Sequence, residues 1–340
     1  MRSRLARLTP RPCRQFFALP IHFSVAAAGL AIMVGTWTDP SRGEDPGDPG
    51  KLTILTGSND RYKAAAVALS DSLRSSGIPN SIIELPSSKD KSAIESVRDQ
   101  LSRESPPIVA ASGEQAVSLA LSTLPSARIV WFMIPNAADA RCVTESQKLG
   151  NRTSGVAADP NPSDRLAWIK RVVPGTSRLI LLHSTATERV LASFVDAGKS
   201  IGVEVVGISV ATGGFGEALK TLASGPCDGV LMIPDAKFYN SGTIQELILW
   251  GLRNKKPIWA FSPNLVKAGA FAGQWTEPAD VGLAAADLVK RMSRTGGEDG
   301  SALHYAPVIK RAVNRNTAER INVSLEDRID QNVTVFGDAP

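Results

Sequence analysis

Small or polar residues follow nearly every apolar segment of strand length in this chain. In the first half they are Ser58, Asn59, Ser112, Gly113 and Asn136, and in the second half they are His183, Ser184, Asp235, Asn240 and Ser262. In open α/β sheets, ligands bind beyond the carboxyl ends of the strands, where helix N-termini present unpaired N–H groups. The pattern therefore predicts a ligand-binding site built from two series of turns.

Asp235 is the only acidic residue placed directly after a predicted strand. In a cleft, its carboxylate would favour a cationic group such as an α-ammonium. Ser, Thr, Asn and Asp are also the residue types that cap helix N-termini, and the four residues from Ser112 to Gln115 fit a capping box. Capping and ligand contact are compatible at the rim of a cleft, so both interpretations stay open for each of these residues.

Aromatic residues gather near the turns of the second half. Phe238, Tyr239, Phe261 and Trp275 are interpreted first as core or hinge packing and only second as ligand-stacking groups. Trp275 follows the last predicted strand, which places it to cover the cleft. We therefore add Trp275 to the predicted ligand-binding residues.

Motifs for catalysis are absent from the sequence. It contains no phosphate-binding G-x-x-x-x-G-K-[ST] loop and no G-x-S-x-G elbow. Its three histidines are too few for a convincing zinc site or a Ser-His-Asp set. We predict that the chain is not an enzyme and needs no cofactor and no metal. The alternative is an enzyme on a Rossmann-like scaffold, with His183 and Asp235 as acid and base.

Strands and helices alternate along the chain from residue 51 onward. Apolar strand segments at 52–55, 81–85, 108–111 and 128–134 are separated by segments with helical spacing of apolar residues. The segment 128–134 is almost wholly apolar, which is typical of a parallel sheet covered by helices on both faces. The pattern predicts an α/β fold of the doubly wound kind.

A polar segment at 135–155 interrupts the alternation, which then starts again. Two series of similar size predict two Rossmann-like lobes with parallel sheets flanked by helices. We expect an N-terminal lobe over residues 51–150, a C-terminal lobe over 151–307, and a crossover and tail over 308–340. Residues 308–335 are expected to cross back and complete the first sheet. Hinge strands are expected near 135–155, 262–275 and 308–316.

The first 50 residues are interpreted as a signal peptide followed by a linker. Five arginines precede an apolar stretch at 16–35, and a segment rich in Pro, Gly and Asp follows. An uncleaved anchor stays open because the stretch is long enough to span a membrane. The 38 basic residues exceed the 33 acidic ones by these five arginines. The remaining chain is neutral, which excludes a nucleic-acid partner.

Three cysteines are too few for a disulfide framework. Cys13 precedes the apolar stretch, a position that does not fit a lipid-anchored cysteine. Cys142 and Cys227 are expected on different lobes as free, partly buried thiols, and a disulfide between them in an oxidising periplasm is the alternative.

Five segments together resemble a known family. They are GVAADP at 155–160, CDGVLMIPD at 227–235, KPIWA at 256–260, VKAGA at 266–270 and VNRNTA at 313–318. Their order and spacing resemble the ABC transporter substrate-binding family of the type I periplasmic-binding fold, in the group related to tryptophan-binding lipoproteins. The resemblance covers residues 51–329. The chain departs from the family in lacking the lipoprotein cysteine and the glycine-containing turn after Ala318.

The resemblance implies a periplasmic component of an ABC importer that captures a small solute, such as an amino acid, by closure of its lobes. It also implies ABC permease subunits in the inner membrane as partners, and we expect a monomer. The polar turns of the family correspond here to Ser58, Asn59, Ser112, Asn136, Asp235 and Asn240. An alternative is a periplasmic sensory or partner domain of the same fold that does not serve transport.

Overall fold

The computed structural model describes residues 52–210, 214–295 and 303–337. The predicted signal peptide and linker lie outside these residues. Within them, no helix has the length and apolar character that crossing a membrane requires.

The first lobe contains a parallel sheet of six strands in the order β11-β5-β4-β3-β1-β2. The strands are β1 (Leu52–Thr56), β2 (Asn80–Glu84), β3 (Ile108–Ser112), β4 (Arg128–Ile134), β5 (Thr153–Ala157) and β11 (Leu303–Tyr305). Every residue of β1, β3 and β5 is buried. This is the burial expected of central strands in a sheet covered on both faces, so the predicted α/β class is confirmed.

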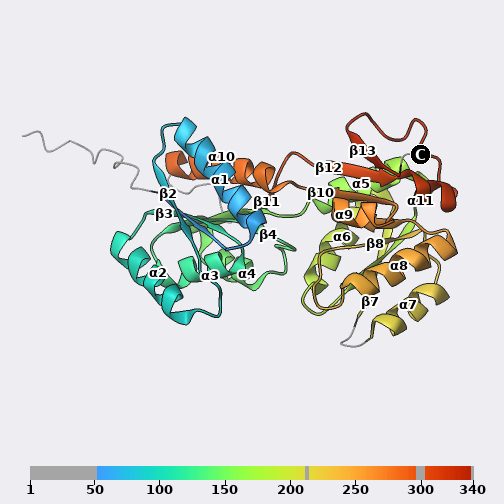
Figure 1. The fold of residues 1–340 in the computed structure, drawn as a ribbon, viewed down its shortest axis with the longest axis horizontal. Helices are drawn as coiled ribbons and strands as arrows, with labels where there is room; N and C mark the ends of the chain where they lie inside the picture. Colours follow the sequence, from blue (N-terminus) through green and yellow to red (C-terminus); the bar gives the residue numbers. More distant parts are fainter. Residues whose placement is uncertain (1–51, 211–213, 296–302, 338–340) are drawn as a thin grey trace, which may run out of the picture. The chain divides into compact units, whose positions relative to one another are not determined.

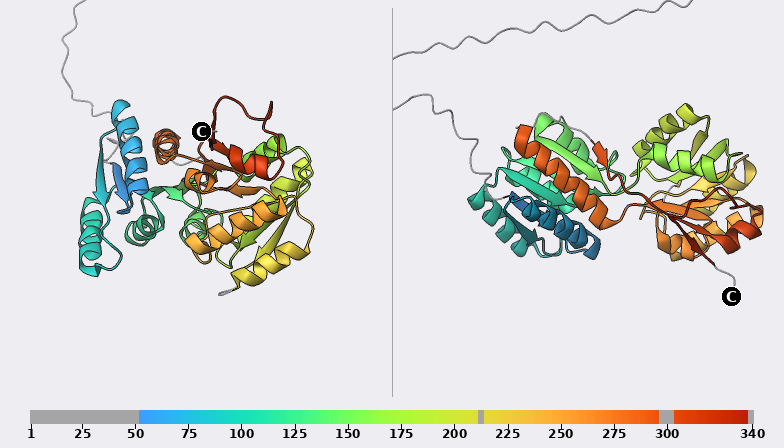
Figure 2. Two further views of the ribbon diagram at one scale, coloured as in Figure 1. Left: turned by 45° about the vertical axis from the view of Figure 1, so that its right-hand side comes forward. Right: turned by 90° about the horizontal axis from the view of Figure 1, so that it is seen from above.

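Two helices, α1 (Asp60–Ser75) and α10 (Pro278–Thr295), pack on one face of this sheet. They lie side by side although about 200 residues separate them (Figure 1; Figure 2, right). A Cβ atom on Gly282 would lie 2.1 Å from the carbonyl oxygen of Ala65, so glycine permits this close approach.

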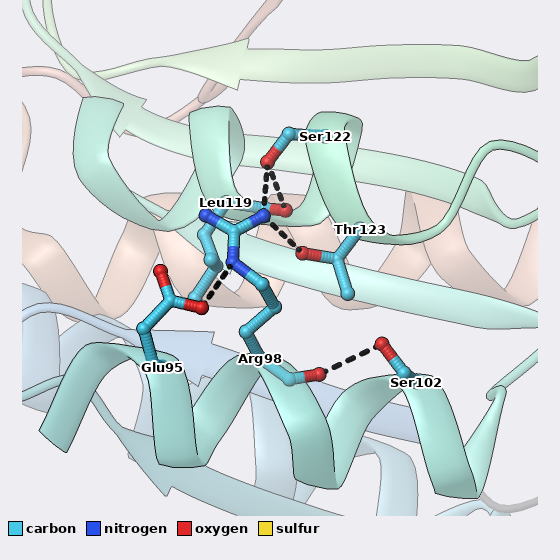
Figure 3. Close-up of polar contacts among 6 residues, drawn as sticks. All are labelled: Glu95, Arg98, Ser102, Leu119, Ser122 and Thr123. Carbon is cyan, nitrogen blue, oxygen red and sulfur yellow. Dashed lines mark hydrogen bonds and ion pairs between the residues drawn. The ribbon is translucent and has the colours of Figure 1, made fainter. Parts of the chain in front are cut away.

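The opposite face carries α2 (Lys91–Glu104), α3 (Glu114–Thr123) and α4 (Arg141–Gln147). Figure 3 shows how Arg98 joins the first two of these helices: its guanidinium lies 3.2 Å from Glu95 and donates to Ser122 and Thr123. The free thiol of Cys142, in the first turn of α4, is buried in the core under these helices.

The second lobe contains seven strands in the order β13-β12-β10-β9-β8-β6-β7. They are β6 (Arg178–His183), β7 (Glu204–Ser209), β8 (Gly229–Leu231), β9 (Ile258–Ala260), β10 (Ala272–Trp275), β12 (Lys310–Asn314) and β13 (Val333–Phe336). All neighbours are parallel except β10 and β12, which run antiparallel.

Helices cover both faces of this sheet as well. One face packs against α5 (Pro162–Val172), α6 (Glu188–Ile201) and α11 (Arg315–Arg320). The other packs against α7 (Phe215–Ser224), α8 (Ser241–Asn254) and α9 (Pro263–Lys267). The free thiol of Cys227 is buried in this second core, so the two cysteines lie on different lobes and unpaired, as predicted.

The chain crosses between the lobes at 158–161, 276–277 and 306–309, which differs from the expected division. Residues 308–335 do not complete the first sheet, because β12 and β13 extend the second. Instead, α10 and β11 return to the first lobe. The chain returns to the first lobe because the apolar face of α10, including Val281, Leu288 and Met292, covers the first sheet beside α1. The crossings lie just outside the predicted hinge segments or at their edges.

Candidate ligand-binding cleft

A cavity of about 290 Å³ lies beyond the carboxyl ends of strands from both sheets. It is lined by Asn59, Arg61, Tyr62, Met133, Pro135, Ala158, Asp159, Pro160, Pro234, Phe261, Ser262, Trp275 and Thr276. The lining segments follow β1, β4, β5, β8, β9 and β10. This is the position in which open α/β sheets bind ligands, and its volume is close to the lower limit of small-molecule sites.

Asp159 is the carboxylate of this cavity. It lies in the first crossing segment, just after β5, and its Oδ2 accepts the backbone N–H of Asn136 at 2.6 Å. No hydrogen bond to Oδ1 is found among the described residues, and this oxygen is not one of the fully buried polar atoms that lack a partner. Burial raises the pKa of Asp159, while the Asn136 N–H and the charges of Arg165 and Arg61 act in the opposite direction. A cation entering the cavity would therefore find a carboxylate with an unused oxygen.

Arg165 is a buried cation behind Asp159. The residue is only 2% exposed. Its Nη2 donates to the carbonyl oxygens of Met232 at 3.0 Å and Ala260 at 3.4 Å. The guanidinium lies 5.5 Å from the centre of the Phe194 ring. Burial lowers its pKa to about 10, and the charge of Asp159 opposes that shift. Arg165 thus fixes α5 to the ends of β8 and β9 and supplies positive charge near Asp159.

Aromatic side chains line the cavity from both lobes. Tyr62 comes from the first turn of α1, Phe261 follows β9, and Trp275 is the last residue of β10. The indole N–H of Trp275 donates to Glu277 at 2.6 Å, which orients the ring. Gly113 has a φ of +84°, and a Cβ there would lie 2.9 Å from the Tyr62 ring. Gly113 therefore acts by leaving room for Tyr62.

Asp235, predicted as a cation-binding group, is occupied within its own lobe. Its Oδ2 accepts the backbone N–H of Ser184 at 3.1 Å, the hydroxyl of Ser184 at 2.7 Å and that of Thr187 at 2.7 Å. Its Oδ1 accepts the N–H of Lys237 at 3.0 Å. Burial alone would raise the pKa of Asp235, but these hydrogen bonds lower it overall. The residue ties the turn after β6 to the turn after β8.

His183 and Ser184 lie in the hydrogen-bonded turn that Asp235 holds, and Nδ1 of His183 lies 3.2 Å from the Ser184 carbonyl oxygen. Asp235, His183 and Ser184 are not among the residues that line the cavity.

The other predicted residues divide between the cavity and helix caps. Asn59 and Ser262 do both, because they line the cavity and cap α1 and α9. Asn240 caps α8 in a capping box and lies outside the cavity lining. Asn136 has a left-handed backbone with φ +47°, and its side-chain amide donates to the Pro234 carbonyl oxygen. Two serines complete the set: Ser58 is exposed, and Ser112 is buried with no partner for its hydroxyl.

Sequence reasoning missed the charged residues of the cleft. Arg165 carried a usable signal, because it shares a helical stripe with Ile169 and Val172, which are buried. A charged residue on an apolar stripe needs a partner. Asp159 and Pro160 belong to one of the segments that resemble the family, but the strand that precedes them was not recognised.

The sequence profile of one family, described as ABC transporter substrate binding protein, matches residues 56–334. The chain belongs to this family. A search of curated proteins gives no match.

Solved structures with the same fold include an ABC domain in complex with L-Trp from Streptococcus pneumonia, 16% identical, with a TM-score of 0.56 over 84% of this chain and 100% of that one. A substrate-binding protein with adhesive properties from Clostridium difficile, in a ligand-free, open structure, is 15% identical, with a TM-score of 0.65 over 85% of this chain and 100% of that one. A conserved domain protein from Vibrio cholerae is 15% identical, with a TM-score of 0.58 over 85% and 100%. These similarities show the type I periplasmic-binding architecture.

Proposed function

We propose that this chain is the periplasmic substrate-binding component of an ABC importer and captures a small solute that carries an ammonium group. The observation that carries the proposal is the carboxylate of Asp159, whose Oδ1 is unpaired within a cavity lined by residues of both lobes. A hydrogen-bonded ammonium would satisfy this oxygen and lessen the cost of burying the charge.

The walls of the cavity favour a solute that also has an apolar or aromatic part. Tyr62, Phe261 and Trp275 line the same cavity as Asp159, and aromatic faces attract both apolar groups and cations. Asn59 and Ser262 add polar groups at the rim. An amino acid with a large side chain fits this combination of one carboxylate and several rings.

Binding by lobe closure follows from a ligand held by groups of both lobes. Such a ligand binds the closed state more tightly than the open state and shifts the population toward it by that difference in affinity. In an importer, the permease subunits distinguish the two states. Membership of the substrate-binding family supports this role, a location outside the cytoplasm, and binding without catalysis.

A thermal-shift screen of the full chain tests the proposal. The panel contains L-tryptophan, the other amino acids, sugars and nucleosides. We expect L-tryptophan or another aromatic amino acid to raise the melting temperature, because a ligand at 100 times its Kd stabilises the folded state by about 2.7 kcal/mol. Calorimetric titration then measures the affinity. A shift produced by sugars or nucleosides, with none from any amino acid, would contradict the proposal.

A further inference from the structure

The helix α6 begins without a cap from its own sequence. Its N-cap residue is Thr187, which makes no capping hydrogen bond. The Thr187 hydroxyl instead donates to Asp235 Oδ2 at 2.7 Å. Asp235 thus diverts the residue that would normally bond the first N–H groups of the helix.

The missing cap comes from the other lobe. Asp139 lies in the β4–α4 loop (residues 135–140) of the first lobe, and its Oδ2 accepts the backbone N–H of Val190 in the first turn of α6 at 2.7 Å. The loop is held in shape by a hydrogen bond from the Asp139 N–H to the Asn136 carbonyl oxygen at 2.8 Å. A carboxylate at a helix N-terminus is also favoured by the helix dipole.

The same loop makes a second contact across the cleft, because the side-chain amide of Asn136 donates to the Pro234 carbonyl oxygen. Asn136, Val190 and Pro234 border a small cavity of about 30 Å³ between this loop and the second lobe. Asp139 therefore joins Asn136 in anchoring the β4–α4 loop to the second lobe.

We propose that Asp139 is a latch residue, which caps α6 only when the lobes are closed and so determines how tightly the closed state holds its ligand. The proposal rests on the function proposed above insofar as it concerns ligand affinity. Its structural part, a cap supplied by one lobe to the other, stands apart from the identity of the ligand. Opening the lobes would expose the first turn of α6 without a capping partner.

The test compares Asp139→Ala, Asp139→Asn and Asp90→Ala in the full chain without ligand, where we expect the contact between Asp139 and Val190 to keep the closed state populated. Hydrogen–deuterium exchange follows the amides of residues 188–194, and small-angle X-ray scattering follows the radius of gyration. Asp139→Ala should speed exchange at these amides about fivefold, because losing an N-cap typically shifts the opening equilibrium of a helix end by about that factor. It should also increase the radius of gyration. Asp139→Asn should stay close to wild type because an amide oxygen also caps.

Asp90→Ala is the matched control. Asp90 caps α2 within the first lobe by accepting the Ala93 N–H at 3.1 Å. Its removal should speed exchange at the start of α2 and leave residues 188–194 and the radius unchanged. A merely local role for Asp139 would change exchange without changing the radius. Unchanged exchange or an unchanged radius in Asp139→Ala would overturn the latch.

Calorimetric titration with L-tryptophan then measures the ligand affinity of wild type and of the variants. Asp139→Ala should weaken binding about fivefold relative to wild type and to Asp90→Ala, and equal affinities would overturn the link to ligand binding. If wild type does not bind L-tryptophan, the proposed ligand class fails while exchange and scattering still decide the latch.

Discussion

Two aspartates that follow parallel strands have opposite uses in this molecule. Asp235, after β8, accepts hydrogen bonds on both carboxylate oxygens from the backbone and hydroxyl groups of its own lobe. Asp159, after β5, accepts a single backbone N–H and keeps one oxygen unpaired beside a cavity. The pKa of Asp235 is lowered by its hydrogen bonds, whereas burial raises that of Asp159. Both residues follow a strand, but only Asp159 keeps an oxygen free for the ligand contact that we propose, whereas Asp235 uses both oxygens within its own lobe.

The largest effect is expected where Asp235 is removed. Asp235→Ala leaves the hydroxyl groups of Ser184 and Thr187 without their acceptor, so the free energy of unfolding in urea should fall by about 3 kcal/mol. Affinity for L-tryptophan should stay within about twofold of wild type. Loss of binding at unchanged stability would show that Asp235, and not Asp159, is the ligand's partner.

Asp228→Ala is a control for this variant. Asp228 flanks the other end of β8 and accepts from the N–H and hydroxyl of Ser177 and the N–H of Arg178. It ties the start of β6 as Asp235 ties the end. Asp228→Ala should destabilise the chain less than Asp235→Ala, because water can replace its exposed and part-buried hydrogen bonds but not the buried ones of Asp235, and it should leave the affinity for L-tryptophan unchanged.

A smaller effect is expected from pH. An ammonium ligand needs the charged form of Asp159, and burial raises the pKa of this carboxyl in the ligand-free chain. Affinity for L-tryptophan should be full above that raised pKa and fall about tenfold for each pH unit below it. Calorimetric titrations between about pH 4 and pH 8 measure the profile. An affinity that rises on acidification would contradict this assignment.

The fold class could be predicted from the sequence, and so could the edge of the sheets at which the cavity lies. Apolar periodicity located most strands within one or two residues, for example Leu52–Thr56 and Arg128–Ile134. It did not reveal which sheet α10 covers, because a periodic stripe shows that a helix is amphipathic without showing its partner. The partner of α10 becomes visible only in the structure, where Gly282 lets the helix approach α1 closely.

Asp159 escaped prediction because β5 does not look like a buried strand. Its residues Thr153, Ser154 and Gly155 are polar or small, yet all are buried. A Cβ on Gly155 would lie 2.0 Å from the Trp131 ring, so the neighbouring strand requires glycine here. Tertiary packing thus concealed both the strand and the acidic residue after it.

The most direct test of the central claim measures the coupling between Asp159 and the ligand's ammonium group. L-tryptophan and indole-3-propionate, which lacks that group, are titrated against wild type, Asp159→Asn and the exposed control Asp164→Asn. Wild type and Asp164→Asn should prefer L-tryptophan by about 10- to 100-fold, the strength of a hydrogen bond between charged groups, and Asp159→Asn should lose that preference. The same preference in all three proteins would contradict the assignment of Asp159 as the residue that binds the ammonium.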